Sequence, residues 1–96
     1  MGGRINMAWN FHGFVALPLE RYANKYIHCS YTTADEIACG GFFETMYSVL
    51  DFKGVDKSAK ANFIDMCRDF EKCRPTDIPR ENTQEIFNEF KRLIGE

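Results

Sequence analysis

Apolar residues recur at helical spacing in four stretches of this sequence, and turn-forming residues separate the stretches. In the first stretch the positions i, i+3, i+4, i+7 and i+8 are apolar, which is the spacing of a helix that buries one face. This pattern predicts a helix over residues 18–28, with Pro18 in the first turn, where a proline costs no hydrogen bond. The apolar face consists of Leu19, Tyr22, Ala23, Tyr26 and Ile27.

The second predicted helix covers residues 33–50 and begins at a capping box, Thr33-Ala34-Asp35-Glu36. Gly40-Gly41 leaves two interpretations open, because the helix is either continuous or divided there into two shorter helices. A continuous helix would carry a narrow stripe of small side chains, suited to close contact with another helix or to a homodimer. The stripe consists of Ala34, Ala38, Gly41, Thr45 and Ser48.

A third helix is predicted over residues 56–73, with Asp56 as its N-cap. Its apolar face is strongly periodic, and Pro75 stops it, because proline lacks the N–H group and disfavours helical backbone in the residue before it. Residues 74–82 also contain Pro79, and we expect them to form an exposed connecting loop.

The fourth helix is predicted over residues 83–94. A second capping signal, Asn82-Thr83-Gln84-Glu85, precedes its apolar stripe, and Gly95 is suited to the helix end.

The amino-terminal residues are less regular than the rest of the chain. Residues 8–17 follow neither a helical nor a strand period, and we expect residues 1–7 to be a flexible tail. A chain of 96 residues is long enough for one domain. The predicted fold is therefore mainly α, a small four-helix single domain with an irregular or short-strand amino-terminal segment.

Aromatic residues are abundant for so short a chain. Nine Phe, four Tyr and one Trp make up 15% of the residues. A domain of this size buries only about 60% of its unfolded surface, so some of the aromatic surface is expected to face solvent. Trp9, Phe11 and Phe14 lie in the irregular segment, where they either close one end of the helical core or anchor a partner.

The charge balance limits the classes of partner. Twelve Lys and Arg against fourteen Asp and Glu give a net charge of -2, without the basic excess that phosphate-backbone binding requires. We also find no apolar run of membrane-spanning length and no signal-peptide pattern. A cytoplasmic protein without membrane contact is expected, and a protein is favoured over nucleic acid as its partner.

Four cysteines raise the question of a zinc or thiol site, but their spacing argues against one. Cys29, Cys39, Cys67 and Cys73 form no Cys-x-x-Cys pair, the usual core of a structural zinc site. His28-Cys29 begins like a phosphatase loop, His-Cys-x5-Arg, yet position 35 is Asp where the phosphate-binding Arg would stand. We therefore expect no catalytic residue, no metal ligand and no cofactor.

The functional hypothesis is a small cytosolic protein–protein interaction protein that acts as an inhibitor, adaptor or regulator of a larger enzyme or complex. Phage- or plasmid-encoded modulators of host enzymes include proteins of this size and kind. Two alternatives stay open: a nucleic-acid-binding helical module that uses the third helix and its basic extension, and a cysteine-based zinc or thiol site. The predicted partner-binding residues are Trp9, Phe11, Phe14, Arg68, Lys72, Arg74, Ile78 and Arg80.

Overall fold

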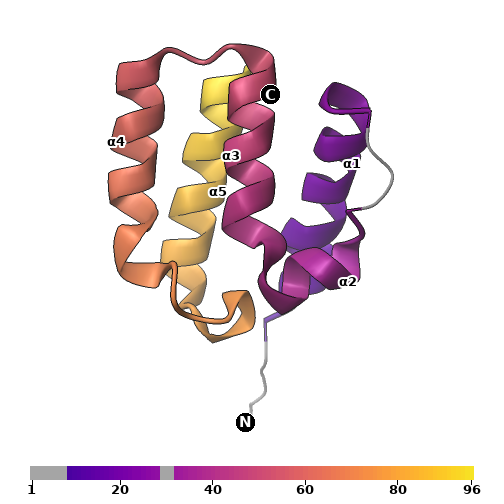
Figure 1. Cartoon of the computed structure of the whole chain (residues 1–96). Coiled ribbons are helices and arrows are strands. Elements are labelled where there is room, and N and C mark those ends of the chain that lie inside the picture. Colours follow the sequence, from indigo (N-terminus) through magenta and orange to yellow (C-terminus); the bar gives the residue numbers. More distant parts are fainter. Residues whose placement is uncertain (1–8, 29–31) are drawn as a thin grey trace, which may run out of the picture.

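Four helices run alongside one another in the computed structural model, which describes residues 9–28 and 32–96 (Figure 1). They are α1 (Leu17–Tyr26), α3 (Phe42–Lys53), α4 (Lys57–Cys67) and α5 (Arg80–Ile94), and α3 touches each of the other three. A short helix, α2 (Ala34–Glu36), crosses near the lower end of α1. The mainly α prediction is confirmed, and the described residues contain no strand.

The amino-terminal segment is helical, which corrects the expectation of an irregular stretch or a short strand. A π-helical turn (His12–Ala16) runs directly into α1. The Asn10 side chain accepts a hydrogen bond from the Gly13 N–H at 2.9 Å and so caps the helix start. The wide turn closes by a bond from the Leu17 N–H to the His12 carbonyl, next to Pro18, which has no N–H to give.

The apolar period of this helix begins at Phe11 and not at Leu19, which is the first apolar residue on the face of the predicted helix. Phe11, Val15, Leu19 and Ala23 are all buried and follow one another at intervals of four residues. His12, Gly13 and Phe14 between them obscure that spacing in the sequence. The predicted tail, residues 1–7, lies outside the described residues.

Gly40 divides the second predicted helix, which decides between the two interpretations of the glycine pair. The capping box forms as expected, with the Glu36 N–H donating to Thr33 Oγ1 at 3.2 Å and the Thr33 N–H donating to Glu36 Oε1 at 2.9 Å. A π-helical turn (Ile37–Gly41) continues α2, and within it Gly40 has φ +151° and ψ -10°. Side chains of L-residues rarely tolerate that backbone, so the glycine permits the change of direction into α3.

The chain between α4 and α5 is more structured than the predicted loop. Asp56 caps α4 by accepting from the Ser58 N–H at 3.0 Å, as expected. α4 ends at Cys67, six residues before the predicted end, and a 3₁₀ turn (Arg68–Phe70) follows it. A second 3₁₀ turn (Pro75–Asp77) leads to α5.

The fourth helix starts before the predicted residue 83. Pro79 stands at the N-cap of α5 and its restricted φ suits a helix entry. Thr83 is fully buried inside the helix and is not a capping residue. The capping signal predicted at Asn82-Thr83-Gln84-Glu85 was therefore wrong. Gly95 ends the helix at φ +82°, as predicted.

Phenylalanines from three helices meet in the core. Phe42 of α3, Phe63 of α4 and Phe90 of α5 are among the largest fully buried side chains, and Leu19 joins them from α1. The ring centroids of Phe63 and Phe90 are 6.4 Å apart, within the range of favourable aromatic pairs. No helix in residues 9–28 and 32–96 combines the length and apolar character needed to cross a bilayer.

Replacing Gly40 by Ala should destabilise the fold although the added methyl group meets no neighbouring atom. The cost comes from the positive φ alone, and we expect about 1–3 kcal/mol in the free energy of unfolding, measured by urea denaturation followed by circular dichroism. Ser48→Ala, at an exposed position of α3, is the control and should change stability by less than about 0.5 kcal/mol. Equal stabilities of the two variants would contradict the assigned kink.

Candidate interaction surfaces

Two aromatic side chains and one arginine form an exposed group at the start of the helical domain. Phe14 is 59% exposed, and its ring stacks on Trp9 with the centroids 6.1 Å apart and the planes inclined by 10°. The Arg80 guanidinium lies 5.9 Å from the Trp9 ring centroid, at the limit of a cation–π contact. We call Trp9, Phe14 and Arg80 the aromatic patch.

The aromatic patch is fastened to the core through edge-to-face contacts. Trp9 meets Phe11 at a centroid distance of 5.9 Å and 87°, and Phe11 meets the buried Phe42 at 5.3 Å and 85°. Trp9 is partly buried by these contacts, whereas Phe14 projects beyond it. Because the stack rests on the core, its rings lose little freedom when a partner covers them.

Two of the predicted partner-binding residues belong to the core, and their assignment to a surface was wrong. Phe11 is 3% exposed and Ile78 is 2% exposed. Phe11 lies on the buried face of the amino-terminal helix, and Ile78 packs inward between the second 3₁₀ turn and α5. The sequence left Phe11 either in the core or at a partner surface, and the structure places it in the core. Ile78, expected in an exposed loop, is also buried.

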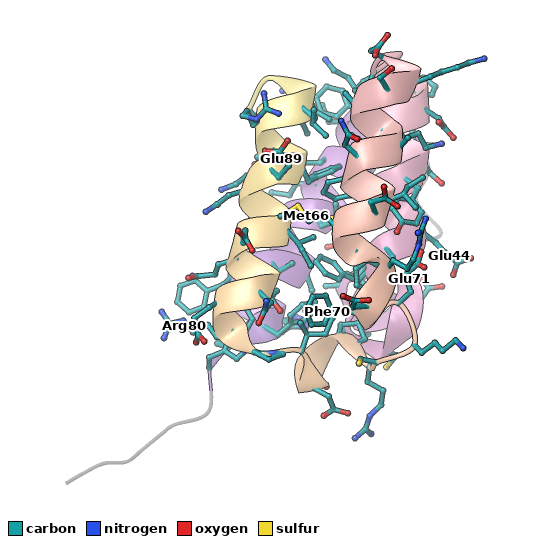
Figure 2. All side chains as sticks on the ribbon, turned by 90° about the vertical axis from the view of Figure 1, so that its left-hand side faces the viewer. Glu44, Met66, Phe70, Glu71, Arg80 and Glu89 are labelled. Atoms are coloured by element: carbon teal, nitrogen blue, oxygen red, sulfur yellow. The ribbon has the colours of Figure 1, made fainter. Side chains whose placement is uncertain are left out.

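The remaining basic residues are exposed but do not form one positive surface with Arg80. Arg68 pairs with Asp65 at 2.7 Å and Arg74 pairs with Asp77 at 2.9 Å. Lys72 is exposed in the segment between them. Figure 2 shows Arg80 at the start of α5 on one side of the domain and Glu71, the neighbour of Lys72, towards the other side.

The small-residue stripe of the second predicted helix is divided by the kink at Gly40. Ala34 and Thr45 are buried within their own chain. Gly41, Thr45 and Ser48 line a hollow of about 290 Å³, together with Ile27 near the end of α1. The stripe therefore does not present the continuous helical surface on which the homodimer hypothesis depended.

The described cysteines are free thiols of two kinds. Cys39 and Cys73 are exposed, whereas Cys67 is buried. Burial raises the pKa of the Cys67 thiol to about 12. Burial also raises the pKa of the neighbouring Tyr47, whose hydroxyl donates to Glu71 Oε2 at 2.8 Å.

No group of three or more potential metal ligands occurs in residues 9–28 and 32–96. Cys29 lies outside these residues, so the His28-Cys29 pair and any site that includes Cys29 stay untested.

A groove with a volume of about 590 Å³ lies between α4 and α5. It was not predicted from the sequence. Figure 2 shows Met66 of α4 between the two helices, with Glu89 of α5 beside it. The α5 residues that line the groove are Glu81, Gln84, Glu85, Asn88, Glu89 and Arg92. In the sequence these polar residues indicate only a solvated helix face. The groove itself could not be predicted, because its concavity arises only when α4 packs against α5.

Comparison with known proteins gives no relative: no family model matches the chain, and no match to a curated protein or a solved structure was found.

Truncation of the buried residues should separate core from surface. We expect Phe11→Ala and Ile78→Ala each to lower the free energy of unfolding by about 2–5 kcal/mol, because each leaves a cavity. Phe14→Ala should change it by less than about 0.5 kcal/mol, since the ring is mostly exposed. Urea unfolding of the three variants measures the difference, and a loss for Phe14→Ala as large as that for Phe11→Ala would place Phe14 in the core.

Thiol chemistry should follow burial. A thiol with a pKa near 12 is protonated at neutral pH and is a poor nucleophile, so Cys67 should not react with a disulfide reagent at pH 8 until the protein unfolds. Cys39 and Cys73 should react in the folded state because they are exposed. The measurement is the number of thiols titrated in a Cys29→Ser background, where two are expected without denaturant and three with denaturant. Three reactive thiols in the folded protein would contradict the burial of Cys67.

Proposed function

We propose that this chain is a small interaction protein without catalytic activity, which binds a larger protein through the aromatic patch and thereby inhibits, tethers or regulates it. The observation that carries the proposal is the exposure of Phe14 while its ring is stacked on Trp9. A large apolar side chain held outward on a preformed support is typical of an interface anchor. The cytoplasmic location expected from the sequence remains part of this proposal.

The composition of the aromatic patch suits a protein partner. Trp, Phe and Arg are enriched at protein interfaces, and a partner that fully covers Phe14 gains about 1.5–3 kcal/mol from the buried apolar surface. Arg80 adds a planar group that can stack and donate hydrogen bonds at the edge of the same surface. Modulation of a host enzyme by a phage- or plasmid-encoded protein is one form that this role would take.

The charge distribution favours a protein partner over nucleic acid. Arg68 and Arg74 each have a carboxylate neighbour on the same segment, so they offer little unpaired charge to a phosphate backbone. The α5 residues that line the groove include three glutamates and one arginine. Their net negative charge would repel a polyanion.

Phe14→Ala should abolish or weaken capture of the partner without altering the fold. Tagged wild-type protein is used to capture partners from a lysate of the source cells, and a protein retained by it is purified and titrated by isothermal calorimetry. We expect Phe14→Ala to raise Kd by about 10-fold or more, since truncation of an interface anchor costs at least about 1.4 kcal/mol.

Phe52→Ala is the matched control, because Phe52 is 58% exposed on α3, far along the chain from the aromatic patch. It removes the same ring from a similarly exposed position and should leave Kd within about twofold of wild type. Equal loss of binding in both variants, or unchanged binding of Phe14→Ala, would refute the aromatic patch as the partner site.

A further inference from the structure

The groove between α4 and α5 has an apolar floor and an acidic border. Met66 contributes a thioether that is neither fully buried nor fully exposed, and most of the accessible lining is carbon. Glu81, Glu85 and Glu89 follow one another at intervals of four residues, so they stand in one row along α5. Successive carboxylates are therefore about 6 Å apart along the helix axis.

Arg92 holds the Glu89 carboxylate of this row in its charged form. A hydrogen bond from Arg92 Nε to Glu89 Oε1, at 2.8 Å, lowers the pKa of Glu89 below its ordinary value, aided by the charge of Arg92. Glu81 and Glu85 are exposed and make no ion pair among the described residues. Two carboxylates of the row are thus available to an incoming cation.

We propose that the groove between α4 and α5 binds a basic amphipathic helix of a partner protein, with an apolar side chain of that helix on Met66 and its Lys or Arg residues on Glu81 and Glu85, the two carboxylates of the row that are unpaired in the described part of the chain. A helix places residues i and i+4 one above the other with a rise of about 6 Å, which matches the spacing of the carboxylates. α4 and α5 lie antiparallel and side by side (Figures 1 and 2), so a third helix fits between their ridges as in a helical bundle. Methionine adapts to apolar groups of different shape.

Charge decides between this occupant and a second copy of the chain. Two copies that met through this face would bring two glutamate rows together, and like charges across an interface cost binding energy. A basic helix is instead attracted by the same carboxylates. α5 keeps its conformation when that helix binds. The surface is separate from the aromatic patch and does not depend on the function proposed for it.

A designed peptide can test the groove directly. The probe is a fluorescein-labelled 18-residue peptide of Leu and Lys in helical amphipathic order, and the reference probe has Glu at every Lys position. Fluorescence anisotropy at low ionic strength should show binding of the Leu/Lys peptide and none of the Leu/Glu peptide. Glu85→Lys should weaken binding by about fivefold or more, because it reverses the charge at the centre of the row. Met66→Gln, which keeps the side-chain length but adds an amide to the floor, should also weaken it.

Glu44→Lys is the matched control, since it makes the same change in net charge at an exposed position of α3 that lies away from the groove (Figure 2). It should change Kd by less than about twofold, and Phe14→Ala should leave Kd unchanged. The proposal fails if the Leu/Lys peptide does not bind, or if Glu44→Lys and Glu85→Lys weaken binding equally. In either case the function proposed for the aromatic patch would be unaffected, because its test is the Phe14 and Phe52 pair.

Discussion

Burial of phenylalanine rings from α3, α4 and α5 is the interaction on which the rest of this structure depends. Phe42, Phe63 and Phe90 are each at most 1% exposed, and each comes from a different helix. Removal of one such ring costs about 3–5 kcal/mol, against a total stability of about 5–15 kcal/mol for a typical domain. The positions of both candidate surfaces follow from this core, because Phe42 supports Phe11 and Trp9, while the approach of α4 to α5 around Phe63 and Phe90 creates the groove.

Periodicity predicted the helical fold because a helix that buries one face must place apolar residues at that spacing. The Thr33 capping box, the Asp56 cap and the Gly95 stop were also correct, since each depends on contacts within one turn of the chain. The Thr83 signal failed because the same residue pattern occurs inside a helix whose start is set by Pro79. Local signals of this kind cannot tell which of two nearby candidates begins the helix.

The exposure of individual aromatic residues was less predictable than the helices. Phe11 and Phe14 are three residues apart in a segment without a clear period, yet one is buried against Phe42 and the other faces solvent. The difference arises because the helix starts at Asn10 and contains a π-helical turn, which sets the direction of each ring. A weak cap and a wide turn leave little trace in the sequence, so Trp9, Phe11 and Phe14 were treated as one group, either core or partner-binding.

α5 gives the domain its two different surfaces. Arg80 at its first turn stands over Trp9, while Glu81 one residue later begins the row that borders the groove. A shift of one residue turns a side chain by about 100° around the helix, so neighbouring positions in sequence face different partners. The apolar stripe of α5 fixes this rotation, because Ile86, Phe87 and Phe90 must face the core. Rotation of α5 by one position would bury a charged side chain, Glu85 in one direction or Lys91 in the other, and would withdraw Arg80 from Trp9. The packing that stabilises the fold therefore also separates a cationic aromatic surface from an acidic one.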